Sequence, residues 1–220
     1  MKNAALFWRG GLSLILLLSA QVVGAFPIFN SNLNPNIVHH RHAWSLQGGF
    51  LLPDASWRKL STEVNEEEFV TRAYYWQTRW EYSISHDWVI RLGGEWQEIY
   101  NDNLHFIGIF VGGDIVDVLY AKLRHRFYGV FTLGFAPYTE FFFRHPSIAP
   151  PQEFDRRGTG YQIKFAFEYE YRWLPTWYWR ATLGYFYEVP LGIEDTPKVS
   201  VKDLTIQGPY AGINLVWRPQ

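Results

Sequence analysis

Residues 161–173 read YQIKFAFEYEYRW, and this stretch decides the fold. Apolar or aromatic side chains occupy every second position of it, and charged residues such as Lys164, Glu168 and Glu170 stand between them. Successive side chains of a strand point to opposite faces. The alternation therefore predicts a strand with one apolar face and one charged face.

The same period of two recurs along the chain and predicts an all-β protein. We expect eight strands, at residues 43–52, 69–84, 88–100, 114–125, 129–143, 159–173, 178–188 and 204–217. The connections between them alternate between long and short: 53–68, 85–87, 101–113, 126–128, 144–158, 174–177 and 189–203. Tight turns at one end and long loops at the other are typical of an up-and-down antiparallel transmembrane β-barrel.

Composition excludes several classes of protein. Aromatic residues make up 19% of the chain and charged residues 19%, which is too apolar for a disordered protein. The net charge of −1 gives no basic surface for nucleic acid, so we expect no nucleic-acid partner. The chain has no cysteine, which excludes thiolate chemistry and disulfides. After Ala25 no apolar run reaches 18 residues, so a helical membrane protein is excluded.

The N-terminus has the features of an export signal. Lys2 and Arg9 are basic, Leu12 to Val23 are mostly apolar, and Gly24-Ala25 offers small residues for cleavage. A retained anchor helix is the alternative, although its apolar core of about a dozen residues is short of the roughly 20 that span a bilayer. We therefore expect a cleaved signal peptide at 1–25, a periplasmic leader at 26–42, the barrel at 43–217 and a C-terminal tail at 218–220.

Alternation alone also fits a water-soluble barrel with its apolar face inside. Tryptophan and tyrosine favour the headgroup level of a membrane, and they gather near the ends of the apolar faces. So many large rings would overfill the interior of an eight-stranded barrel. We therefore expect the apolar faces to meet lipid, with two aromatic belts formed by Trp44, Tyr74, Tyr82, Trp88, Trp96, Tyr161, Trp173, Trp179, Tyr187 and Trp217.

The opposite faces then fill the lumen with charges of both signs. Cations are expected at Arg79, Arg91, Lys122, Arg124, Lys164, Arg172 and Arg180, and anions at Glu81, Glu95, Glu168, Glu170 and Glu188. Charges held away from water persist when they are paired, and neighbouring strands supply partners. We expect a structural core of ion pairs that plugs the barrel. A conduit or buried site made of the same residues is the alternative.

In this arrangement the chain resembles the small outer-membrane β-barrels, in the manner of the OmpA transmembrane domain or the OmpW group. The likeness covers residues 43–217 and concerns architecture. Gly212, Leu215 and Trp217 also resemble the C-terminal signal read by the outer-membrane assembly machinery. Tyr210 stands where that signal prefers a polar residue, and three residues follow the terminal aromatic. The resemblance implies a location in the outer membrane of a Gram-negative bacterium, with membrane lipids, lipopolysaccharide and the assembly machinery as partners.

The chain has seven histidines, which are candidates for a chemical site. His39, His40 and His42 could gather a metal, but a solvated leader is the expectation. His86 and His125 are expected at tight turns, and His105 and His145 on outer loops. Some barrels of this membrane are lipid A or phospholipid acyl hydrolases, which need a hydroxyl activated by a base. Ser147 near His145 lies on a proline-rich stretch, so we predict no enzyme, catalytic residue, cofactor or metal.

The pair Arg156-Arg157 and the residue Asp117 each allow two interpretations. Arg156-Arg157 in the third outer loop could meet lipid phosphates, because a guanidinium suits a phosphate, or it could simply stay solvated. Asp117 is costly if it faces lipid, so it should lie at the outer rim unless the register of its strand differs. We therefore expect a structural or surface-interaction protein. A passive channel for small or hydrophobic solutes and the lipid-modifying hydrolase are the alternatives.

Overall fold

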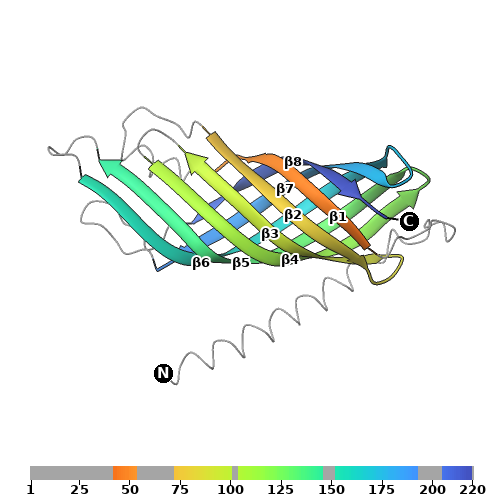
Figure 1. Ribbon diagram of the computed structural model, residues 1–220, viewed down its shortest axis with the longest axis horizontal. Coiled ribbons are helices and arrows are strands. Elements are labelled where there is room, and N and C mark those ends of the chain that lie inside the picture. Colours follow the sequence, from red (N-terminus) through yellow and green to blue (C-terminus); the bar gives the residue numbers. More distant parts are fainter. Residues whose placement is uncertain (1–41, 54–71, 101–103, 146–151, 193–204, 220) are drawn as a thin grey trace, which may run out of the picture.

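The computed structural model describes residues 42–53, 72–100, 104–145, 152–192 and 205–219. Its eight strands are β1 (His42–Leu51), β2 (Arg72–Ser83), β3 (Trp88–Tyr100), β4 (Leu104–Lys122), β5 (His125–His145), β6 (Gln152–Arg172), β7 (Trp177–Leu191) and β8 (Ile206–Trp217). Each strand pairs antiparallel with the next, and β1 pairs with β8 (Figure 1). The predicted eight-stranded up-and-down barrel is confirmed. Within the described ranges no helix is long and apolar enough to cross a membrane.

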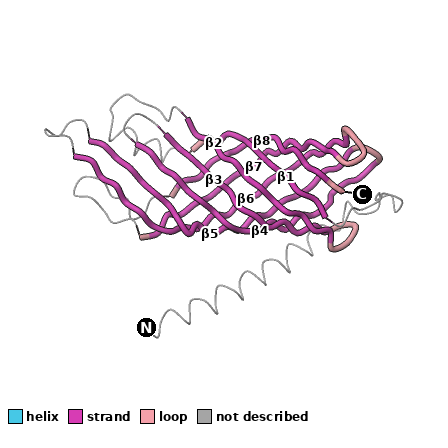
Figure 2. The backbone as a smooth tube through the Cα atoms, in the orientation of Figure 1, coloured by secondary structure: helices cyan, strands magenta, loops and turns pink. Residues whose placement is uncertain are grey.

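The two ends of the barrel differ. Short turns join β2 to β3, β4 to β5, and β6 to β7, and all three lie at the end where β1 begins and β8 ends (Figure 2). We call this the turn end, and the opposite end the loop end. In the first turn the hydroxyl of Ser85 accepts hydrogen bonds from the backbone N–H groups of Asp87 and Trp88, at 3.2 and 3.1 Å. Such serine turns suit tight connections between strands.

Three predicted connections were placed wrongly. Residues 104–113 belong to β4 and residues 152–158 to β6, and the turn expected at 126–128 lies at Leu123 and Arg124. Along 104–113 Phe106 and Phe110 are buried, while Ile109 and Val111 are exposed. Both faces of this part of β4 are apolar, so the sequence shows no polar alternation to mark a strand.

Interruptions of the ladder change which side chains face inward. The register between β4 and β5 shifts between Val118 and Tyr120. Val118 and Ala121 are both buried, at an odd spacing, so the extra residue reverses the alternation beyond it. Lys122 is consequently exposed at the turn end, and Arg124 is exposed because it lies in the turn itself, so the predicted place of both in the lumen was wrong.

Apolar side chains lie on the outer wall of the barrel, and charged side chains lie inside it. Phe167, Leu183 and Ile213 on the outer wall are 72%, 65% and 66% exposed, whereas the inward Arg180 and Glu170 are 1% and 0% exposed. A water-soluble barrel would show the opposite distribution. An apolar outer face around a polar interior is the arrangement of a barrel that spans a membrane.

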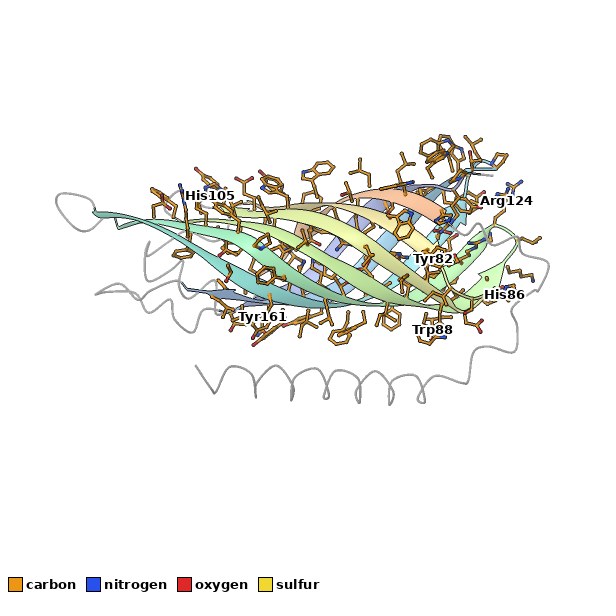
Figure 3. The ribbon with its side chains drawn as sticks, turned by 60° about the horizontal axis from the view of Figure 1, so that its bottom comes forward. Tyr82, His86, Trp88, His105, Arg124 and Tyr161 are labelled. Atoms are coloured by element: carbon orange, nitrogen blue, oxygen red, sulfur yellow. The ribbon has the colours of Figure 1, made fainter. Side chains whose placement is uncertain are left out.

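The predicted aromatic belts are confirmed at both ends of the apolar wall. Near the turn end the outer face carries Trp44, Tyr82, Trp88, Trp173, Trp179 and Trp217, and near the loop end it carries Tyr74, Trp96, Tyr161 and Tyr187. Figure 3 shows Tyr82 and Trp88 near the turn end and Tyr161 farther along the barrel toward the loop end. Rings with a polar edge at these levels suit the two interfaces of a bilayer.

Asp117 lies at the rim of the apolar wall. It pairs with Trp88, the first residue of β3, so it is close to the turn end, and its predicted place at the outer rim was wrong. Its side chain is half-buried on the outward side. This position at the interface explains how a carboxylate is tolerated on a strand that faces lipid.

The outward placement of Phe165 gives a first test. Phe165 is 59% exposed in the middle of β6, beside Phe131 and Tyr185 on the neighbouring strands. We expect Phe165→Arg to lower the free energy of unfolding by about 2 to 4 kcal/mol, because it puts a charge in hydrocarbon near the bilayer midplane. Denaturant titration of the barrel in lipid vesicles measures the change. Phe165→Leu is the matched control, and a loss equal to that control would contradict the outward assignment.

Candidate functional site

The interior of the barrel near the turn end holds a cluster of four ionised side chains, Glu81, Glu170, Arg180 and Arg218. Arg180 bridges the two carboxylates, with its Nη1 2.7 Å from Glu81 Oε1 and its Nη2 2.6 Å from Glu170 Oε2. Arg218 donates to both oxygens of Glu170, at 2.7 and 2.9 Å. All four residues are at most 5% exposed. Bidentate pairing of this kind gives a buried guanidinium and carboxylate their strongest mutual stabilisation.

A second set of ion pairs lies farther from the turn end. Arg91 contacts Glu168 at 2.8 Å and Glu81 at 3.3 Å, which links this set to the first. The carboxylate of Asp114 lies 3.5 Å from Arg79 and 3.9 Å from Arg91. Each carboxylate thus faces at least one cation, which offsets the cost of removing the charges from water.

Lys164 occupies the next level of the lumen. Its ammonium is ion-paired with Glu95, and it lies 5.0 Å from the ring centre of Tyr75 and 5.2 Å from that of Tyr210. The Nε2 of Gln97 donates to Glu95 at 2.5 Å. An ammonium between two ring faces and a carboxylate is stabilised electrostatically where water is excluded.

Beyond this level large apolar side chains predominate in the lumen, and the buried Glu188 lies among them, opposite Ile206 on the neighbouring strand. The last inward residues before the loop end include Leu51, Ile99, Phe106, Phe141 and Ile206, each at most 2% exposed and part of one packed cluster. They come from β1, β3, β4, β5 and β8, so they close the interior from several sides. We call these five residues the apolar cap.

Most of the predicted lumenal charges are found where they were expected. The side chains of Arg79, Arg91, Lys164, Arg180 and all five glutamates are buried inside the barrel. Arg172 is half-buried at the turn end, where its Nη2 donates to the carbonyl of Pro175 at 3.0 Å. Its predicted place is therefore confirmed only at the mouth of the lumen. Lys122 and Arg124 lie outside it, for the reason given above.

Three charged residues of the interior were not predicted from the sequence: Asp114, Arg126 and Arg218. Arg126 Nη1 lies 3.9 Å from Glu170 Oε1, and Arg218 was expected in a tail. Arg218 directly follows β8, and its burial continues the inward series of Asn214 and Val216. The period of two could have found Arg218, because the alternation does not stop where the hydrogen-bonded ladder ends.

The described histidines lie on the outer surface. His42 begins β1 and packs on the rings of Trp80 and Tyr82, at 5.7 and 5.3 Å between centroids. His125 is exposed next to the turn before β5, and its Nδ1 is 2.7 Å from the hydroxyl of Tyr169. His86 is exposed in the turn before β3, as expected. His39 and His40 fall outside the described residues, and so does the side chain of His145. Among the described residues no three potential ligands are grouped to hold a metal ion.

His105 was predicted on a loop, and this prediction was wrong because it faces outward on β4. Its Nε2 lies 2.7 Å from Glu98 Oε1, and the hydroxyl of Tyr74 donates to the other oxygen of Glu98. A carboxylate that orients an imidazole is part of many hydrolytic sites, but a nucleophilic hydroxyl must also be near. The serines that the structure describes, Ser45, Ser83 and Ser85, belong to the turn-end half of the barrel, whereas His105 lies at the loop end (Figure 3).

Arg157 lies on strand β6 rather than on the predicted loop. Its side chain is 67% exposed, and its Nη2 lies 3.6 Å from Glu140 and 3.8 Å from Asp155. The side chain of Arg156 is outside the described part of the chain. Two carboxylates close to Arg157 reduce the positive field that a phosphate would meet at this point.

A closed antiparallel barrel with an apolar wall, two aromatic belts and a charged interior belongs to the class of outer-membrane β-barrels. No family model matches the chain, and no curated protein matches it. Similar solved structures include the N-terminal barrel domain of Pseudomonas aeruginosa OprF, with 10% identity over 81% of this chain and 98% of that chain and a TM-score of 0.43. Neisserial surface protein A shows 9% identity, 81% and 97% coverage, and a TM-score of 0.47. Ail of Yersinia pestis shows 11% identity over 80% of this chain and 96% of that chain, with a TM-score of 0.41. These likenesses concern barrel architecture alone.

The ion-pair cluster gives a second test. Glu170 faces both Arg180 and Arg218, so Glu170→Ala leaves two buried guanidinium groups with too little negative charge. We expect a loss of about 3 to 5 kcal/mol in the free energy of unfolding. The control is Glu140→Ala at the exposed rim, where loss of one surface ion pair should cost about 1 kcal/mol or less. Equal losses in the two variants would contradict a stabilising role for the cluster.

Proposed function

We propose that this protein is a non-conducting outer-membrane barrel that presents its loop end to the outside of the cell as a structural or surface-interaction element. The observation that carries the proposal is the filled interior. Ion pairs occupy the half near the turn end, and the apolar cap occupies the other end. The interior therefore stabilises the fold, and the outer wall and the loop end make the contacts with the surroundings.

The lengths of the connections support the orientation. Short turns face the periplasm in barrels of this class, and longer loops face outward. The turn end also holds the C-terminus of the barrel and the start of β1 (Figure 1). A leader after a cleaved signal peptide would then enter the barrel from the periplasm.

The two alternatives have less support. A passive channel needs a continuous polar path, and the apolar cap stands across it. An acyl hydrolase needs a nucleophile beside its base, and the described part of the chain offers His105 only the carboxylate of Glu98 as a hydrogen-bonded partner. We therefore propose a role without catalysis, cofactor or metal.

The proposed partners follow from this location. Tyr161 is 39% exposed in the belt near the loop end, at the level where lipopolysaccharide would surround the barrel. Leu215 and Trp217 are 45% and 41% exposed on the outward face of β8, where the assembly machinery could read them. We propose the contact with lipopolysaccharide for the mature protein and the contact with the assembly machinery for the folding protein.

Conductance in planar bilayers tests the proposal. The purified barrel should insert without stable single-channel current steps at neutral pH, because ion pairs and the apolar cap fill the lumen. A known open porin inserted under the same conditions is the positive control. Reproducible current steps with one conductance value would overturn the proposed non-conducting barrel.

Single cysteines test the orientation, since the chain has none of its own. Asp155→Cys at the loop end should react with a bulky, membrane-impermeant maleimide on intact cells, because residue 155 is exposed. Arg124→Cys at the turn end should react only after the outer membrane is permeabilised (Figure 3). Glu168→Cys, which replaces a buried lumenal side chain, is the protected control. The reverse pattern for positions 155 and 124 would refute the orientation.

A further inference from the structure

Two arginines line a hollow at the turn end. The hollow is about 220 Å³ and lies between the turn after β4 and the turn after β6, lined by Arg124, Arg172, Trp173, Leu174 and Pro175. The backbone N–H of Arg172 donates to the carbonyl of Arg124 at 2.8 Å, which holds the two turns together. Trp173 and Leu174 are 63% and 45% exposed beside it. The hollow therefore combines cationic groups with side chains suited to a membrane interface.

The charge of this region is positive. The structure gives the side chain of Arg124 no ion-pair partner among the described residues, and Lys122 next to it is exposed. The nearest acidic residue on β6, Glu170, points into the lumen and is bound by Arg180 and Arg218. Asp87 and Asp117 lie on the far side of β4, against β3. An anion is the ligand that suits such a hollow, and a phosphate suits guanidinium groups in particular.

A second hollow, of about 260 Å³, lies on the outer wall. The outward residues that line it come from β4 to β7 and are Leu119, Phe127, Phe167, Tyr169, Ala181 and Leu183. Ala181 is small between larger neighbours, and Gly129 nearby leaves space in front of Leu119. The hollow therefore faces the hydrocarbon of the bilayer with apolar walls.

The two hollows are aligned along the same strands. Arg172 and Tyr169 are three residues apart on β6, about 10 Å along the strand, and Arg124 and Phe127 are separated by the same number of residues at the start of β5. Tyr169 faces outward, whereas Arg172 faces the mouth of the lumen at the rim, with its guanidinium 5.9 Å from the ring centre of Tyr178. Between the hollows, His125 stacks on Tyr169 at 5.9 Å, and Tyr171 contacts Trp179 at 6.1 Å. The cationic hollow is thus at headgroup level, the rings are at the interface, and the apolar hollow is in the acyl region.

We propose that these two hollows together form a binding site for one anionic glycerophospholipid of the leaflet at the turn end. Its phosphate would lie between Arg124 and Arg172, and one acyl chain would cover Ala181. The proposal rests on the orientation proposed above, which makes this leaflet the phospholipid-rich inner one.

A second copy of the barrel fits this surface less well. Two copies that met symmetrically through this face would bring the arginines of both toward each other, and like charges would oppose the contact. A lipid with a negative headgroup instead matches both the apolar and the cationic part of the site.

Native mass spectrometry of the full mature barrel in a neutral detergent tests the site. Phosphatidylglycerol should be retained in a one-to-one complex in preference to phosphatidylethanolamine. Arg124→Gln and Arg172→Gln should each weaken the retention about five-fold, and the two together about twenty-five-fold, because each cation near the headgroup contributes independently. Arg157→Gln, an exposed arginine at the loop end, is the matched control and should leave the retention unchanged.

The apolar part has its own variants. Ala181→Phe should fill the hollow and lower retention of both lipids, whereas Ala211→Phe, at an outward alanine of β8, should not. The heat-dependent gel mobility of each variant shows that it has folded. Unchanged retention in the double arginine variant would overturn the proposal. So would stronger retention of lipid A than of phosphatidylglycerol, or a dimer that Ala181→Phe dissociates. These outcomes concern lipid binding alone and leave the conductance test independent.

Discussion

The rest of the structure depends on the closure of the sheet by hydrogen bonds between β1 and β8. In hydrocarbon every backbone N–H and C=O must find a partner within the protein, because no water is present to replace it. The register from Trp44 opposite Trp217 to Leu51 opposite Tyr210 meets this requirement and leaves no open edge. Closure also divides all side chains of the strands into two sets, those that face lipid and those that face one another inside.

The inward set must fill a narrow tube, and it does so by matching large groups with small ones. A side chain at Gly49 would approach the ring of Tyr75 to 2.6 Å, and one at Gly184 would approach that of Tyr210 to the same distance. Two glycines therefore make room for the two tyrosines that flank Lys164. Most of the ionised groups in this tube are stabilised by oppositely charged neighbours in place of water.

The two ends of the barrel differ in the side chains of the lumen and in those of the outer surface. Near the turn end the lumen is ionic and the outer surface carries cations and rings at an interface. Toward the loop end the lumen is mostly apolar apart from the buried Glu188, and polar clusters such as His105 with Glu98, or Arg157 with Glu140, lie on the outer wall. A barrel with a filled interior can act on its surroundings only through such outer surfaces, and this is the physical reason that both proposals are placed there.

The sequence by itself determined the barrel, its even number of strands, its aromatic belts and most of its lumenal charges, because a period of two is visible wherever one face is polar and the other apolar. It did not reveal the loop-end half of β4, where Phe106 and Ile109 make both faces apolar. Only the tertiary structure decided that Lys122 lies outside, since one inserted residue beyond Val118 reverses the faces and leaves no mark in the sequence. The partnership of Arg180 with Glu81 and Glu170 was likewise decided only by closure, because residues distant in the chain meet across the lumen once the sheet has become a tube.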